Sequence, residues 1–219
     1  MAAGGELRLT PLADVERDLP STRINDGRTD RAGNFVFGTM NEDEGHPAIG
    51  SFYQWSTGAG LRRLDLPRVG IANSISFSPD GQTMYFCDSP TGRIMHCRYD
   101  AASASVSDAR DFATLTADEG QPDGSIVDAD GCLWNAAWGA AMVRRYRPDG
   151  TVEREIAVPA KNPTCAVWGG AAMNELFITS ARQDMSPAEL ELVPDAGGIY
   201  RAQIEDVVGL RDSVFRDGL

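Results

Sequence analysis

Residues 120–134 read GQPDGSIVDADGCLW and contain two Asp-Gly pairs in different surroundings. The second pair, at 130–131, precedes the apolar residues Leu133 and Trp134, which is typical of a turn between two β-strands. The first pair begins at Asp123 and comes too early in the stretch to form that turn. Asp123 therefore needs another explanation, and the rest of the chain supplies one.

The chain repeats this pattern of short strands and glycine turns. Four segments each place a small or polar residue before a short strand, a glycine-containing turn and a more apolar strand: NDGRTDRAGNFVFGTM, NSISFSPDGQTMYFCD, DGSIVDADGCLWNAAW and TCAVWGGAAMNELFITS. A further strand pair trails each segment, which gives about four strands per unit. The turn glycines Gly33, Gly81 and Gly131 lie 48 and 50 residues apart. Four-stranded units at this period indicate a β-propeller, and the regular spacing favours it over the alternative, a β-sandwich.

The repeat gives Asp123 counterparts. Counting back eight residues from each turn glycine gives Asn25, Asn73 and Asp123, and Thr164 is the counterpart in the less regular fourth unit. Because the first strand of each propeller blade lines the central channel, these side chains should converge at one mouth of it. Amide and carboxylate oxygens suit a hard divalent cation. The alternative is that these residues hydrogen-bond only to their own turns.

Composition limits the classes of function. The 219 residues are 42% hydrophobic and 24% charged, with a formal net charge of -12. This balance is typical of a soluble globular protein, and the acidic charge argues against nucleic acid and anionic membranes as partners. The sequence has no apolar stretch of the roughly 18 residues that a membrane span needs, and its first residues do not read as a secretory signal.

Cysteine and histidine usage argues against a zinc site built from these residues. The chain has four cysteines and two histidines, and no two cysteines form a C-x-x-C pair. Cys87 and Cys97 flank a turn and could face each other across a hairpin. We expect instead that the cysteines are buried, reduced thiols in a cytoplasmic protein.

The order and spacing of the repeated blocks resemble those of the regucalcin/gluconolactonase family, also called senescence marker proteins. STRINDGRTDRAGNFVFGTM is similar to the family block R-x-N-D-G-x-x-D-x-x-G-x-x-x-x-G-T-M, and QPDGSIVDADGCLWNAAWG to P-D-G-x-x-x-D-x-x-G-x-L-W. IANSISFSPDGQTMYFCDS resembles the N-G-L-x-F-S-P-D-G strand, with Ser74 where glycine is usual. NELFITSARQDMSPAELELVPDAGGIYR resembles the late block that ends in A-G-G-[IL]-[FY]. The resemblance runs from about Leu9 to the end of the chain.

This resemblance implies an all-β fold of the six-bladed β-propeller type, with about four to five blades present. We expect residues 1–219 to form a single propeller domain that lacks the first blade and part of the second at its N-terminus. The E-G-P-x-W-type motif of the family's first blade, which carries a glutamate metal ligand, has no match in the sequence. A missing blade would leave apolar blade faces and a strand edge open.

The resemblance also implies an activity, the hydrolysis of sugar-acid lactones such as gluconolactone or pentonolactones by metal-activated water. One divalent cation is implied, with Zn, Ca, Mn and Fe all left open. Asn73 and Asp123 match two of the three protein ligands of that metal, and Asp123 also matches the proposed general base. The alternative is a catalytically impaired propeller that binds sugar-acid ligands or divalent cations without turnover.

Substrate contacts are implied in the same way. Arg23 and Asn25 match residues that bind the sugar hydroxyls. Asp43, in GTMNEDEGHP, is the best match to an acidic substrate contact, with two neighbouring glutamates as alternatives. We expect His46 to be an exposed loop histidine, whereas Trp138 fits either the pocket or the core. The oligomeric state is left open.

Overall fold

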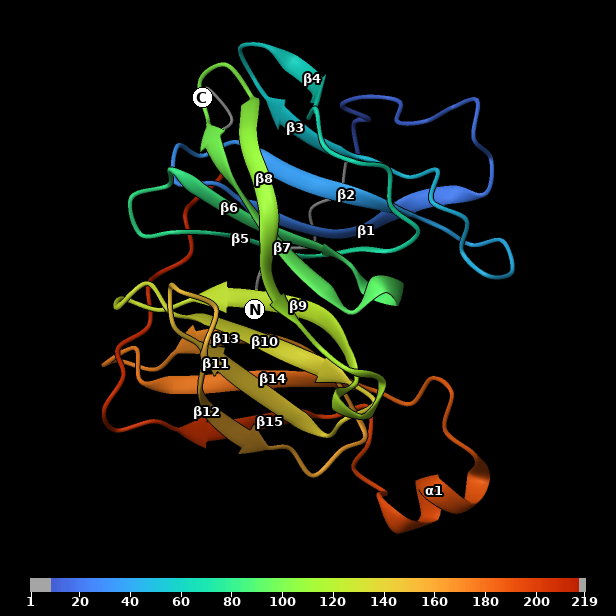
Figure 1. Cartoon of the computed structure of the whole chain (residues 1–219), viewed down its shortest axis with the longest axis vertical. Coiled ribbons are helices and arrows are strands. Elements are labelled where there is room, and N and C mark those ends of the chain that lie inside the picture. The colour runs from blue at the N-terminus through green and yellow to red at the C-terminus, as the bar shows by residue number, and fades with distance from the viewer. Residues whose placement is uncertain (1–8, 217–219) are drawn as a thin grey trace, which may run out of the picture.

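The computed structural model describes residues 9–216, and these form four antiparallel β-sheets that stand side by side as propeller blades (Figure 1). In each sheet the strands are hydrogen-bonded in chain order. Blade 1 holds β1 (Thr22–Thr29), β2 (Phe35–Asn41), β3 (Phe52–Ser56) and β4 (Gly60–Arg63). Blade 2 holds β5 (Ala72–Phe77), β6 (Thr83–Asp88), β7 (Arg93–Asp100) and β8 (Ser105–Thr114). Blade 3 holds β9 (Gln121–Val127), β10 (Leu133–Trp138), β11 (Met142–Tyr146) and β12 (Val152–Ala157). Blade 4 holds β13 (Asn162–Gly169), β14 (Glu175–Ala181) and β15 (Ile199–Gln203).

Helical structure in the described part of the chain is limited to the connections. The 3-10 helices η1 (Ser89–Thr91) and η2 (Ala117–Glu119) and the α-helix α1 (Pro187–Leu192) follow strands β6, β8 and β14. None of these helices has the length and hydropathy that a membrane crossing requires. The all-β propeller prediction is therefore confirmed, with four blades among residues 9–216.

The turn between the first two strands is built alike in blades 1 to 3. Its glycines, Gly33, Gly81 and Gly131, have φ of 92°, 73° and 79°, the left-handed region that favours glycine. In blade 4 Met173 takes that conformation, with φ of 54°. This substitution explains why the fourth unit looks irregular in sequence although the turn is retained.

Apolar cores fill the space between neighbouring blades. Phe52 of blade 1 meets Phe86 of blade 2 edge to face, with ring centroids 5.2 Å apart. Two buried tryptophans, Trp134 and Trp168, meet in the same way at 5.2 Å between blades 3 and 4. Because each blade buries one face against its neighbour, the stack holds the inner strands of all four blades in register around one axis.

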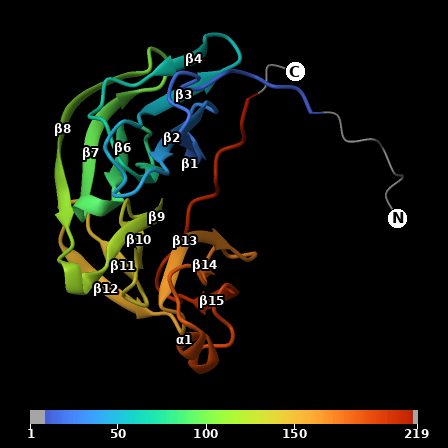
Figure 2. The same cartoon turned by 90° about the vertical axis from the view of Figure 1, so that its right-hand side faces the viewer.

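The four blades form an arc, and the C-terminal segment runs from blade 4 back to blade 1 (Figure 2). Asp212 forms an ion pair with Arg28 at 2.6 Å, and the Arg216 backbone N–H donates to the Gly33 carbonyl at 2.9 Å. The ring of Phe215 lies 5.6 Å from that of Trp55. This segment therefore ties the last blade of the arc to the first.

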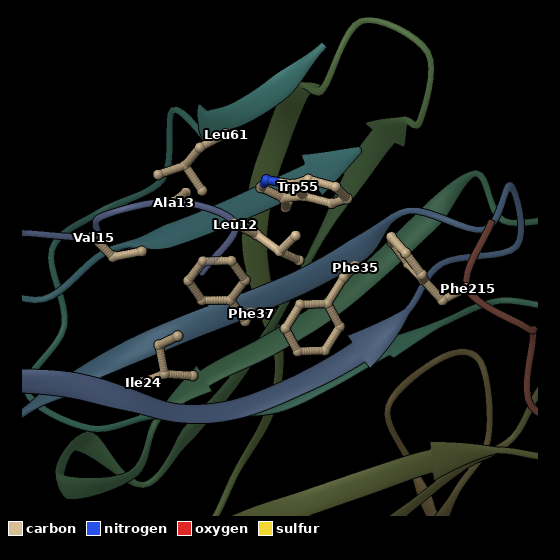
Figure 3. A pocket seen from close by; sticks show the side chains of 9 residues that line it. All are labelled: Leu12, Ala13, Val15, Ile24, Phe35, Phe37, Trp55, Leu61 and Phe215. Carbon is tan, nitrogen blue, oxygen red and sulfur yellow. The ribbon is translucent and has the colours of Figure 1, made fainter. Parts of the chain in front are cut away.

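The outer face of blade 1 is apolar, as expected of a blade face without a neighbouring blade. It carries a cavity of about 360 Å³ that the chain segments before β1 and at Phe215 partly cover (Figure 3). The lining residues are Leu12, Ala13, Val15, Ile24, Phe35, Phe37, Trp55, Leu61 and Phe215.

All four cysteines are free thiols, and three of them are buried. Cys87 lies opposite Ile94 and Cys97 opposite Met84 in the β6–β7 register, so the two cysteines do not face each other. The expectation of burial holds for Cys87, Cys97 and Cys132, whereas Cys165 is half-buried. Burial raises the pKa of Cys97 to about 12, which keeps its thiol protonated and unreactive at neutral pH.

Candidate functional site

A β-bulge marks the predicted ring position in every blade. The strand register shifts between Ile24 and Gly27 in blade 1, and between Pro163 and Cys165 in blade 4. Blade 2 has its shift directly after Asn73, and blade 3 has it around Asp123. Since a bulge bends the strand and redirects its side chains, these repeated bulges turn the ring positions toward the end of the channel.

The backbone conformation of Ser74 explains why glycine is usual at this position in the family pattern. It follows Asn73 inside the blade 2 bulge and has φ of 62°, in the left-handed region. A glycine, usual at this place in the resemblance, adopts that conformation without strain. The Ser74 side chain is fully buried, and its hydroxyl lies 2.6 Å from that of Ser125 in blade 3.

Four of the five predicted site residues line one cavity of about 420 Å³ at the end of the channel, namely Arg23, Asn25, Asn73 and Asp123. They come from the first strands of blades 1, 2 and 3, which lie side by side around the axis. The sequence-based expectation that these distant positions converge is therefore met, while the roles assigned to them stay predictions. The other lining residues are Met40, Gly45, His46, Ile71, Ser89, Pro90, Gln121, Pro122, Trp138, Gln183 and Asp184.

A chain of hydrogen bonds runs along the wall of this cavity from blade 1 to blade 3. Arg23 donates to Asn25 Oδ1 at 3.3 Å, and Asn25 Nδ2 donates to Asn73 Oδ1 at 3.2 Å. Asn73 Nδ2 then donates to Ser89 Oγ at 2.9 Å, and Ser89 donates to the Pro122 carbonyl at 2.7 Å. The chain of hydrogen bonds therefore connects Arg23, Asn25 and Asn73 and ends at the backbone of Pro122, the residue before Asp123.

Asp123 is in an unfavourable environment for a lone carboxylate. Burial, together with the nearby Asp26 carboxyl, raises the pKa of Asp123 to about 8, and the Gly124 backbone N–H only partly offsets this. The pKa of Asp26 is itself raised by burial, although its carboxylate accepts hydrogen bonds from the backbone N–H groups of Gly27 and Ile75, each at 2.8 Å. At neutral pH the carboxyl of the metal-free protein is therefore mostly protonated, and a cation beside it would favour the ionised carboxylate.

The donor set fits a hard divalent cation. Asp123 and Asn73 line the same cavity, and their carboxylate and amide oxygens are ligands that such a cation prefers. Within residues 9–216 no group of three His, Cys, Asp or Glu side chains is close enough to hold an ion. Two protein oxygens therefore leave further coordination positions for water, substrate or another ligand.

The fifth predicted residue, Asp43, does not line the cavity. Its neighbour Glu42 accepts a hydrogen bond from Arg23 Nε at 2.7 Å, which places an acidic group beside the predicted substrate contact. Glu42 does not line the cavity either, so the assignment of the acidic substrate contact stays a prediction.

Residues outside the predicted set also shape the cavity. Trp138 lines it, which decides between the alternatives left open for that residue. His46 was expected to be exposed, but it is half-buried, lines the cavity, and its Nδ1 lies 2.7 Å from the Asn41 carbonyl. Thr164 does not line the cavity, and its hydroxyl lies 2.6 Å from that of Thr179. Ser89 was missed because its only sequence signal is its position directly after strand β6, in CDSPTG.

An arc of antiparallel blades with a polar cavity at the end of its channel defines a β-propeller protein. A family model described as SMP-30/Gluconolactonase/LRE-like region matches residues 2–182. The chain belongs to this family, which confirms the resemblance read from the sequence.

Individual relatives agree. The chain is 48% identical over 195 residues to an L-arabinolactonase of Azospirillum brasilense, covering 89% of this chain and 64% of that protein. It is 32% identical over 214 residues to regucalcin of Xenopus laevis, covering 94% and 71%. A solved structure of regucalcin from Agrobacterium tumefaciens, described as calcium-binding, superimposes with a TM-score of 0.88 at 37% identity, covering 95% and 70%. The chain thus spans about two thirds of the length of the relatives it matches.

Proposed function

We propose that this chain forms the substrate site and part of the metal site of a sugar-lactone hydrolase. The observation that carries the proposal is the meeting of Arg23, Asn25, Asn73 and Asp123 in one cavity of about 420 Å³. That volume lies in the range of small-ligand sites, roughly 300–1,000 Å³. The lactonase named among the relatives supports a five- or six-carbon sugar-acid lactone as substrate.

The polar lining matches the chemistry of such a substrate. Arg23, half-exposed at the cavity wall, offers several fixed N–H donors, and Asn25 both donates and accepts. These two groups orient the sugar hydroxyls, and Glu42 holds the Arg23 side chain in place through its hydrogen bond to Nε. The indole ring of Trp138 supplies an apolar wall against the carbon skeleton.

Asp123 is the base in this proposal. As a carboxylate it takes one proton from a water molecule, while the oxygen of that water attacks the lactone carbonyl carbon. The ring C–O bond then breaks, and the ring oxygen takes up the proton, which yields the open-chain hydroxy acid. Burial and the nearby Asp26 raise the pKa of Asp123 in the metal-free protein, which makes its carboxylate a stronger base than an ordinary aspartate.

A divalent cation held by Asn73 and Asp123 would supply the Lewis acid that polarises the lactone carbonyl and stabilises the negative charge formed on attack. The Asn73 side chain is 7% exposed and fixed on both sides by hydrogen bonds. Its amide oxygen is therefore already in place before any ligand arrives, which lowers the cost of binding one.

The test is lactone hydrolysis by the chelator-dialysed chain, with Mn, Zn, Ca or Fe added back separately. Gluconolactone and a pentonolactone serve as substrates, with the acid released followed by a pH indicator. Asp123→Asn should lower kcat/KM by about 10²–10⁴-fold, because a general base is lost. Asp65→Asn, which removes an exposed carboxylate outside the cavity, is the matched control. Unchanged turnover in Asp123→Asn would refute the proposal.

The second candidate is a propeller that binds sugar-acid ligands or divalent cations without turnover. It is favoured by the presence of only two metal-suited oxygen side chains from the predicted ligand set in the cavity. This candidate predicts that the chain binds Mn²⁺ and a sugar acid in calorimetry while lactone is hydrolysed no faster than in buffer.

A further inference from the structure

The directed hydrogen-bond chain in the cavity wall points to a role for a residue outside the predicted set. Ser89 lies at the start of η1, is 5% exposed and lines the cavity. Its hydroxyl touches both halves of the predicted metal site, since it bonds Asn73 directly and also bonds the carbonyl that precedes Asp123.

The direction of these bonds follows from their last acceptor. A carbonyl oxygen can only accept, so Ser89 must donate its one hydroxyl hydrogen to Pro122 at 2.7 Å. The hydroxyl then has only lone pairs to offer Asn73, which must therefore present its Nδ2 group to Ser89. The amide oxygen of Asn73 is forced to the other end, where Asn25 donates to it at 3.2 Å. Ser89 thus decides which end of the Asn73 amide is an acceptor.

The same hydroxyl fixes the backbone beside Asp123. The Pro122 carbonyl accepts from Ser89, and the next carbonyl, that of Asp123, accepts from the buried Asn135 Nδ2 at 2.9 Å. The Cys87 thiol donates a second, weaker hydrogen bond to the Pro122 carbonyl, at 3.4 Å. Both carbonyls flanking the Asp123 side chain are therefore held by buried groups, which limits how far its carboxylate can swing.

We infer that Ser89 is a positioning residue that turns the Asn73 amide oxygen and the Asp123 carboxylate toward one shared divalent cation. The inference rests on the proposed function, because it assigns Ser89 to the metal site of that function. Groups that orient metal ligands typically change metal affinity by about 10–100-fold when they are removed.

The first measurement is Mn²⁺ binding by titration calorimetry at pH 8. Ser89→Ala should raise the Kd at least about 10-fold, since the Asn73 amide is then free to flip. Ser89→Thr keeps a hydroxyl on a side chain that borders the cavity and should bind close to wild type. Ser76→Ala is the matched control, because it removes a buried hydroxyl of β5, the strand that carries Asn73, and this hydroxyl bonds the Ser74 carbonyl at 3.2 Å.

The second measurement needs no metal. In wild type only one of the two Asn73 Nδ2 protons can point at Ser89, so the two proton resonances should be well separated in an amide NMR spectrum, with Asn73→Ala giving the assignment. Ser89→Ala should bring the two resonances together, and Ser76→Ala should not.

The outcomes separate the two proposals. Wild type that binds no Mn²⁺ counts against the proposed function, while the NMR result still decides the orientation of Asn73. Wild type that binds Mn²⁺, with Ser89→Ala binding equally well or Ser89→Thr failing as Ser89→Ala does, overturns the inference about Ser89 alone.

Discussion

Metal affinity at the cavity should depend steeply on pH between 8 and 6, because a proton competes for Asp123. The pKa of this carboxyl is raised to about 8 by burial and by Asp26. A group with that pKa is about half protonated at pH 8 and about 99% protonated at pH 6, so apparent affinity should fall ~50-fold over the interval. An ordinary aspartate, ionised throughout this range, would give no change.

Two variants locate the effect. Asp123→Asn removes the carboxylate, so Mn²⁺ should bind weakly and with no pH dependence. Asp26→Asn removes a negative charge that raises the Asp123 pKa, and an amide oxygen can still accept from the Ile75 N–H. In Asp26→Asn the loss of Mn²⁺ affinity should therefore occur at lower pH than in wild type. In Asp123→Asn the Mn²⁺ affinity should be low at every pH.

Titration calorimetry in buffers of matched ionic strength at several pH values gives the curve. A second check is the proton count, since binding near pH 7 should release close to one proton, seen as a dependence of the measured enthalpy on buffer ionisation heat. Equal affinity at pH 6 and pH 8 in wild type would refute the assignment of Asp123 as a metal ligand with a raised pKa.

Three further predictions concern stability. Between about pH 4 and about pH 8 the carboxyl of Asp123 is protonated in the metal-free folded state but ionised in the unfolded state. The Tm of the metal-free protein should therefore fall as pH rises toward 8, and Asp123→Asn should not show this fall. Ser74→Gly relieves left-handed backbone strain of about 1 kcal/mol but loses a hydrogen bond worth about as much, so the free energy of unfolding in urea should change little. Ser74→Ala keeps the strain and loses the hydrogen bond, so the same free energy should fall by about 1 kcal/mol. Asp128→Ala leaves the buried Arg145 without its main partner and should cost about 3–5 kcal/mol in the same assay, whereas Asp130→Asn, an exposed partner, should cost less than about 1 kcal/mol.

Much of the fold was predictable because each blade repeats the same sequence pattern of strand, glycine turn and strand. The spacing of Gly33, Gly81 and Gly131 reflects a turn that requires left-handed backbone, and that requirement is visible in sequence. The same count located Asn25, Asn73 and Asp123, since residues at equal distance from equivalent turns lie at equal depth in the channel. The turn of blade 4 could not be recognised from its sequence, because Met173 adopts the left-handed conformation that glycine adopts in blades 1 to 3.

What could not be predicted depends on contacts between blades. Ser89 meets Pro122 across the blade 2–blade 3 boundary, and Gln183 and Asp184 reach the cavity from the segment after β14. Such contacts follow from the bulges and the angle between sheets, which no short motif encodes. The hydrogen bond from Arg23 to Glu42 was equally hidden, because the two residues are 19 positions apart and meet only through the pairing of β1 with β2.

Two of the three aspartates in the stretch at 120–134 show why residue type alone does not identify a site. Asp128 is fully buried, and its carboxylate accepts from two backbone N–H groups, from the Trp134 indole at 2.8 Å and from Arg145 at 2.8 Å. The oxygens of Asp128 are therefore already hydrogen-bonded and paired within the fold, and they are not available to bind a ligand. Asp123 lies five residues earlier, borders the cavity, and has a pKa raised to about 8. A buried carboxylate that has few hydrogen-bond donors and no cationic partner binds a proton or a cation more readily than one that has them. For that reason we propose Asp123, and not Asp128, as the general base and metal ligand.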